Sequence, residues 1–221
     1  MKKLLLLLLC CTAASAEAQN WSLGVGTGPF VFGHFVRRTT RVATPEGSAT
    51  QTVTLSAATR AGLSVDIERR FGDRFAVRLE GAFTRAPLAV KGDERQDDAV
   101  DIPAGDIDVA TMMLPLVVRI NPRGTFRFHI MGGPAAAAYT IRTRPNAAGS
   151  IPIFRGTRTE WGGAFGAGMA WQWNENFGIE GSVVDINTSS PFRKDEIGGL
   201  GTVEIERPDN LHSTIGIRYR F

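Results

Sequence analysis

FAVRLEGAFT, residues 75–84, alternates strictly between apolar or small residues and polar or small ones. Phe75 and Leu79 fall on one side of the alternation, and Arg78 and Glu80 fall on the other. Successive side chains of a β-strand point to opposite faces, so this period of two is the pattern of a strand. The stretch therefore predicts a strand with one apolar face and one polar face.

The same alternation recurs along the chain and predicts about eight strands. Each run is long enough for a tilted strand crossing a bilayer, which needs about 9–11 residues. The predicted strands lie near residues 21–32, 54–69, 75–84, 109–120, 125–139, 160–173, 177–187 and 211–221.

Short and long connections alternate between these strands. Outer-membrane barrels have short periplasmic turns and longer extracellular loops. We therefore expect an all-β protein, an eight-stranded antiparallel up-and-down transmembrane β-barrel with both termini in the periplasm. The short connections are 71–74, 121–124 and 174–176, and the long ones are 33–53, 85–106, 140–159 and 188–209.

Alternation alone does not separate a membrane barrel from a soluble lipocalin-like carrier, whose apolar face points inward. Two groups of aromatic residues favour the membrane, because a bilayer has two interfaces. The group near the short turns contains Trp21, Phe71, Phe75, Phe126, Phe128, Trp171, Trp173, Phe177, Tyr219 and Phe221. The group near the long loops contains Phe30, Phe32, Phe35, Phe83, Tyr139 and Trp161. Glycines on the polar face, such as Gly24 and Gly168, suit a narrow lumen.

Residues 1–18 have the pattern of a cleaved secretory signal peptide. Two lysines precede a leucine run, and Ala16-Glu17-Ala18 provides an A-x-A site with cleavage after Ala18. Residues 19–221 would then form the barrel domain and reach the cell outer membrane.

The composition argues against several function classes. The net charge is only +3, and no basic cluster is interleaved with aromatics, so we expect no nucleic-acid partner. Both cysteines, Cys10 and Cys11, fall in the expected signal peptide, which leaves no thiol nucleophile or cysteine metal site in the barrel. We expect no cofactor and no metal.

Charged residues on the polar face predict an ion-pair network inside the barrel. Hairpin pairing should place Glu68 opposite Arg78, and Glu180 near Arg218. Buried charges need partners, so such a network would fill the lumen. The alternative is a narrow pore for small solutes, gated by exchange of Arg–Glu pairs. The predicted set is Glu68, Arg78, Glu80, Arg119, Arg127, Glu180, His212 and Arg218.

The third long loop is basic and contains no acid. Arginine forks bind phosphates well, so this loop is a candidate contact for lipopolysaccharide. The candidate residues are Arg142, Arg144, Arg155 and Arg158.

A lipid-A-modifying enzyme is a further alternative, but we assign no catalytic residue. His212 and Ser213 are the nearest approach to a nucleophile and base, and adjacent strand residues point to opposite faces.

Two features resemble a known family. The ending Tyr219-Arg220-Phe221 resembles the aromatic-x-Phe signal that the barrel-assembly machinery reads, with Tyr219 and Phe221 as the signal residues. The stretches 112–119 and 128–134, MMLPLVVR and FHIMGGP, resemble the small outer-membrane barrel superfamily, which includes the PorT-like and OmpA/OmpX-like barrel domains. The resemblance implies a barrel architecture rather than an activity.

Together these observations predict a small monomeric outer-membrane barrel with a structural or surface-interaction role through four long extracellular loops. Its expected partners are outer-membrane lipid, lipopolysaccharide and, during insertion, the assembly machinery.

Overall fold

The computed structural model of the chain is built from β-strands. It describes residues 20–44, 47–92, 101–144, 155–194 and 202–221. The expected signal peptide lies outside the described residues. Within them, no helix has the length and apolarity needed to cross a membrane.

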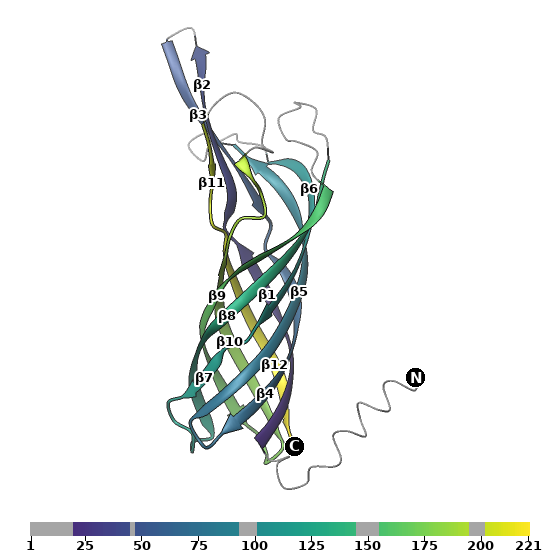
Figure 1. Ribbon diagram of the computed structural model, residues 1–221, viewed down its shortest axis with the longest axis vertical. Coiled ribbons are helices and arrows are strands. Elements are labelled where there is room, and N and C mark those ends of the chain that lie inside the picture. The colour runs from purple at the N-terminus through teal and green to yellow at the C-terminus, as the bar shows by residue number, and fades with distance from the viewer. Residues whose placement is uncertain (1–19, 45–46, 93–100, 145–154, 195–201) are drawn as a thin grey trace, which may run out of the picture.

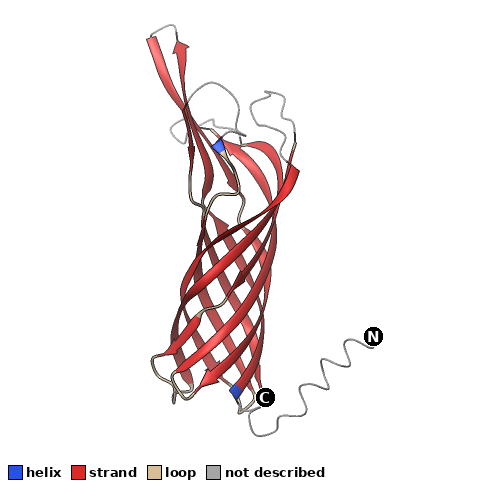
Figure 2. Ribbon diagram, viewed as in Figure 1, coloured by secondary structure: helices blue, strands red, loops and turns tan. Residues whose placement is uncertain are grey.

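Eight strands form a closed antiparallel barrel (Figure 2). Each strand pairs with the next one in space, and β1 closes the ring by pairing with β12. This arrangement confirms the predicted fold class. The barrel strands are β1 (Trp21–Phe32), β4 (Arg60–Phe71), β5 (Phe75–Lys91), β6 (Ile102–Met113) with β7 (Leu116–Arg119), β8 (Phe126–Thr143), β9 (Arg155–Gln172), β10 (Phe177–Thr188) and β12 (Asp209–Arg220).

The connection predicted as a long loop at 33–53 is instead a β-hairpin. Strands β2 (His34–Thr44) and β3 (Gly47–Ala57) extend beyond the barrel at the end away from the short turns (Figure 1). The predicted strand 54–69 was therefore wrong, because the chain divides it between β3 and β4. Threonine and valine favour strands, but a mostly polar ribbon lacks the alternation that marks a half-buried one.

A short strand from the last long connection joins this hairpin. Strand β11 (Thr202–Ile205) pairs antiparallel with β2 over Val36–Thr39. The hairpin base is thus held on one edge by β11, and on the other by β5, which pairs with Thr54–Ala57 of β3.

The single strand predicted at 109–120 is broken at Leu114-Pro115. Proline has no N–H to give to the ladder, so a strand is interrupted there. Backbone hydrogen bonds bridge the break: Leu114 N donates to Pro134 O, and Pro115 O accepts from Arg78 N, each at 3.0 Å. β6 and β7 therefore act together as one barrel strand.

The three short turns lie where the sequence predicted them, at one end of the barrel. In one, Asn174 Oδ1 accepts from the backbone N of Phe177 at 2.7 Å. In another, Asn121 Oδ1 accepts from the backbone N of Phe128 at 2.6 Å. We call this end the turn end, and the opposite end the loop end.

The outer face of the barrel is apolar. Large side chains on every strand point away from the lumen and are exposed, including Val25, Leu63, Phe165, Val183 and Ile215. Around the turn end the exposed aromatics predicted as a group form an outward belt, as the bilayer interface favours. Its members are Phe71, Phe75, Phe126, Phe128, Trp171, Trp173, Phe177, Tyr219 and Phe221, with Trp21 half-buried beside them.

The second predicted belt is mostly wrong. At the loop end only Phe83 and Trp161 point outward, whereas the other four predicted members are buried. Phe30 and Phe32 share the inward face of β1 with the lumen glycines, so alternation directs them into the barrel. Phe35 and Tyr139 are also buried in the interior, each with no exposed surface.

The lumen is narrow enough that backbone from adjacent strands leaves no room for side chains at some positions. Gly216 on β12 faces Gly26 on β1 across the closing pair. A Cβ on Gly216 would overlap the carbonyl oxygen of Val25 and the Cα of Gly26. On the outer face the constraint disappears: for Gly81, the nearest atom to such a Cβ is Thr111 O, at 3.8 Å.

We predict that Gly216→Ala destabilises the barrel by about 1–3 kcal/mol, because the new methyl group forces the β1–β12 pair apart. Gly81→Ala is the matched control and should leave stability nearly unchanged. Urea unfolding of the protein in lipid vesicles, followed by tryptophan fluorescence, measures both. Equal stability of the two variants would contradict the close approach at the closing pair.

Candidate functional site

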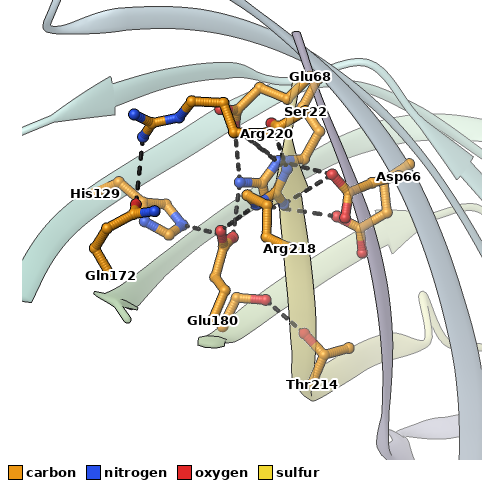
Figure 3. Close-up of polar contacts among 12 residues, drawn as sticks. Ser22, Asp66, Glu68, His129, Gln172, Glu180, Thr214, Arg218 and Arg220 are labelled. Atoms are coloured by element: carbon orange, nitrogen blue, oxygen red, sulfur yellow. Dashed lines mark hydrogen bonds and ion pairs between the residues drawn. The ribbon is translucent and has the colours of Figure 1, made fainter. Parts of the chain in front are cut away.

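The turn-end half of the lumen contains a cluster of charged side chains contributed by β4, β5, β7, β10 and β12, part of which is shown in Figure 3. Inward-facing positions of β4, β5, β10 and β12 supply its centre. The central members are Asp66, Glu68, Arg78, Glu80, Glu180 and Arg218.

Arg78 lies at the middle of this cluster and is 2% exposed. Its Nη2 lies 2.8 Å from Glu68 Oε2 and 2.7 Å from Glu180 Oε1. Asp66 and Glu80 lie farther from the same guanidinium, at 3.7 and 3.9 Å. One buried cation is therefore surrounded by carboxylates from three strands.

Arg218 is the second central cation. Its Nε donates to Glu180 Oε2 at 2.6 Å, and its Nη2 lies 2.8 Å from Asp66 Oδ1. Its Nη1 donates to Ser22 Oγ at 3.2 Å, which connects the network to β1 (Figure 3). The network thus crosses the β1–β12 pair that closes the barrel.

Glu68 is fully buried and is shared by several arginines. Arg119 from β7 and Arg78 both contact it, and Arg70 Nε lies 3.5 Å from its Oε1. A buried carboxylate without partners would be very unfavourable, so these contacts are what permits Glu68 to stay ionised in the interior.

Sequence reasoning placed Glu68, Arg78, Glu80, Arg119, Glu180 and Arg218 in one network, and the structure brings these six together. The sequence analysis omitted Arg70 and Ser22 from the network. Alternation could have found both, because Arg70 lies two residues from Glu68 on the same face of β4, and Ser22 lies on the same face of β1 as the lumen glycines.

Two further arginines face the lumen near its turn-end opening. Arg127 Nε donates to the carbonyl of Gly124 at 3.2 Å, and Arg220 Nη2 donates to Gln172 Oε1 at 3.3 Å. Neither has a carboxylate within 4.0 Å among the described residues. Arg127, predicted as a network member, thus lines the opening rather than the ion-pair centre.

His212 does not belong to the charge network, contrary to the prediction. Its ring stacks on Phe30 with the centroids 3.8 Å apart, and both ring nitrogens are buried with no hydrogen-bond partner. Alternation correctly predicted that His212 faces the lumen. It did not predict the position of His212 along the barrel axis, which is in the apolar part of the lumen. The described residues therefore pair His212 with neither a serine nor a carboxylate.

An apolar cluster fills the lumen toward the loop end. Phe35 packs edge-on against Tyr139 and Phe192, with ring centroids 6.3 and 5.8 Å away. Residues of β1, β5, β6 and β8 complete the cluster, including Phe30, Leu88, Ile107 and Ile141. The barrel interior is thus charged at the turn end and apolar at the loop end.

Polar contacts hold this apolar cluster in place. The Tyr139 hydroxyl lies 2.7 Å from Thr188 Oγ1 and accepts from Asn210 Nδ2 at 2.8 Å. Ser190 Oγ donates to the carbonyl of Phe35 at 3.2 Å, which ties the segment carrying Phe192 over the cluster. The hydroxyls of Tyr139 and Ser190 are thus hydrogen-bonded in the interior, as buried polar groups usually are.

The basic residues predicted as a lipopolysaccharide contact are not a set of unpaired cations. Arg142 Nη2 lies 2.7 Å from Asp108 Oδ2, and Arg144 Nη2 lies 3.2 Å from Asp106 Oδ2. Arg158 Nη1 donates to the carbonyl of Pro191 at 2.8 Å. The side chain of Arg155 lies outside the described residues. The acids come from β6, which begins at Ile102 and not near the predicted residue 109.

The predicted assembly-signal residues lie on the outer face at the turn end. Tyr219 and Phe221 are 37% and 42% exposed, and their rings meet edge-on at 5.1 Å. The Phe221 backbone N donates to the carbonyl of Trp21 at 3.1 Å, so both aromatics lie beside the pair of strands that closes the barrel.

The charge network leaves little free space. Two cavities touch it, and each has a volume of about 20 Å³. A cavity of this size has room for about one or two water molecules. The geometry therefore provides a filled interior rather than a solute path.

We predict that Glu68→Gln destabilises the protein by about 3–5 kcal/mol, since it leaves buried Arg78 and Arg119 short of a counter-charge. Asp73→Asn is the control, because its partner Arg123 is 3.5 Å away and both side chains are exposed, at 68% and 90%. That change should lower the free energy of unfolding by less than about 1 kcal/mol. Chemical unfolding in vesicles tests both, and a Glu68 variant as stable as the control would refute the network's contribution.

Comparison with known proteins gives a consistent result. The family model for the outer membrane protein beta-barrel domain matches residues 4–221. No curated protein sequence matches the chain significantly.

Three solved structures illustrate the structural likeness. The outer membrane protein OprG from Pseudomonas aeruginosa is 16% identical, with 93% of this chain and 98% of that chain covered and a TM-score of 0.63. AlkL, solved in DMPC lipid bilayers, is 15% identical, with coverage of 93% and 91% and a TM-score of 0.55. OmpW from Escherichia coli is 19% identical, with coverage of 93% and 100% and a TM-score of 0.45. The likeness to OprG and AlkL supports a shared fold, and identities this low leave activity open.

Proposed function

Since the chain belongs to the outer membrane protein β-barrel domain family, we propose that it is a sealed outer-membrane barrel with a surface-interaction role. It acts through its loop-end segments, above all the β2–β3 hairpin. The observation that carries the proposal is the double closure of the lumen, by the charge network at the turn end and by the aromatic cluster at the loop end.

The hairpin supplies the surface. Beyond its base, Arg41–Ala43 pair with Ser48–Thr50 across the ribbon, and no other described strand pairs with these residues. Arg41 and the run from Gly47 to Gln51 are exposed. Open strand edges are ready to pair with another extended polypeptide, which is a common mode of recognition.

The two alternative functions have less support. A narrow pore would need the Arg78 and Arg218 pairs to separate, and each bridges carboxylates at 2.6–2.8 Å. A lipid-A-modifying enzyme would need a base near a nucleophile, and His212 instead stacks on Phe30.

We predict that the purified protein in planar lipid bilayers shows no single-channel conductance. Phe35→Ala should also stay silent, because the charge network alone closes the lumen. Discrete current steps from the unsubstituted protein would refute the sealed barrel. Current steps from the Phe35→Ala variant alone would show that the charge network does not close the lumen by itself, and would refute closure at both ends.

We further predict that the hairpin faces the outside of the cell. A thiol introduced as Thr50→Cys should react with a membrane-impermeant maleimide on intact cells. Arg123→Cys, in a turn at the other end, should react only after the outer membrane is permeabilised, and the unsubstituted protein serves as the blank. The reverse labelling pattern would overturn the proposed orientation and the surface role with it.

A further inference from the structure

The lumen charges are segregated by depth. Asp66, Glu80 and Glu180 all lie within 4.0 Å of Arg78, and Arg218 adds contacts to two of them. These three carboxylates are therefore paired with the two central arginines, Arg78 and Arg218. Nearer the turn-end opening, Glu68 is the one carboxylate that arginines share within the described residues.

The turn-end half of the lumen has more arginines than carboxylates. Six arginines face four carboxylates there, and Glu175, which lines the vestibule at the opening, adds one further carboxylate. The arginines are Arg70, Arg78, Arg119, Arg127, Arg218 and Arg220, and the carboxylates are Asp66, Glu68, Glu80 and Glu180.

Two of these guanidinium groups have N–H donors without a hydrogen-bond partner. Arg119 is only 8% exposed, and its Nη1 is buried without a hydrogen-bond partner. Arg220 Nε is likewise buried and unpartnered. Unsatisfied buried donors are rare in folded proteins and often indicate an absent water or ion.

The two arginines that carry these donors line a small cavity. A chamber of about 20 Å³ is lined by Arg119, Arg127 and Arg220, among others. A vestibule of about 690 Å³ at the turn end shares four lining residues with it, Arg127, Gln172, Asn176 and Arg220. A ligand group entering the vestibule therefore meets Arg127 and Arg220, which also line the chamber, and Arg119 lies behind them on the chamber wall.

We propose that the turn-end opening is a binding site for an oxyanion of the phosphate class, held by Arg119, Arg127 and Arg220. Arginine forks match phosphate oxygens with paired hydrogen bonds. Arg119 and Arg127 come from the adjacent strands β7 and β8, and Arg220 comes from β12, so an anion between them would be contacted from two directions. A bound oxyanion would also offset the excess of arginines in this half of the lumen. The group belongs either to a soluble phosphate compound or to a phospholipid headgroup.

The test uses the full barrel domain folded in a sugar-based, phosphate-free detergent, with inorganic phosphate titrated by calorimetry. Binding should be saturable and competed by sulfate, but not by chloride at the same ionic strength. Absence of saturable binding, or equal competition by chloride, would overturn the proposal.

Variants then locate the site. Arg127→Gln combined with Arg220→Gln should weaken phosphate binding by about tenfold or more, since it removes charge-assisted hydrogen bonds. Arg123→Gln in the exposed turn is the matched control and should bind like the unsubstituted protein. Equal weakening by the control would show a diffuse charge effect and refute the site. A heat-modifiability gel verifies that each variant is folded.

The same titration in phospholipid nanodiscs identifies the source of the phosphate. If a headgroup is the ligand, added phosphate binds more weakly in nanodiscs than in detergent. Phospholipid then also co-purifies with the unsubstituted protein, but not with the double variant. If a soluble compound is the ligand, the affinity is the same in both media. The outcome is independent of the hairpin, so it is separate from the proposed surface role.

Discussion

Closure of the sheet between β1 and β12 is the constraint on which the rest of the structure depends. Inside a bilayer, every backbone N–H and C=O must find a protein partner, and strands achieve this only when the sheet has no open edge. The chain meets the requirement with a register that runs from Ser22 opposite Arg220 to Phe32 opposite Asn210. The Gly26–Gly216 pair and the Ser22–Arg218 hydrogen bond both lie on this closing pair of strands.

A ring of eight strands is narrow, and narrowness explains the interior. Side chains that point inward must fill the lumen or be omitted, which accounts for glycines at positions such as Gly216. Charged side chains that point inward lose their hydration and need partners of opposite charge, which accounts for the ion pairs around Arg78 and Glu68. The network therefore stabilises the barrel and blocks it at the same time. A protein built this way has its accessible surfaces at the two ends.

The two ends have different chemistry. The loop end is sealed by aromatic residues and extended by the β2–β3 hairpin, which presents polar side chains and strand edges. The turn end is open to a vestibule lined by Arg127, Arg220 and Glu175, among others. The first suits contact with another polypeptide, and the second suits a small anion. Membership in the outer-membrane barrel family gives these surfaces a location at the cell envelope.

The sequence by itself determined the barrel, most of its strands and the identity of the inward charges. These follow from a period of two that is local to each strand, so Glu68, Arg78, Glu180 and Arg218 could be assigned to one face without coordinates. Pairing of Glu68 with Arg78 also followed, because a short turn fixes the register of a hairpin. Depth along the barrel axis was decided only by the tertiary structure. Strand tilt and stagger set that depth, and they placed His212 against Phe30 and brought Phe30, Phe35 and Tyr139 together in one internal cluster. The same reason separates Arg127 from the ion-pair centre and places Asp106 and Asp108 beside Arg144 and Arg142. Alternation specifies which face a side chain occupies, whereas packing of the closed ring specifies which neighbours it meets there.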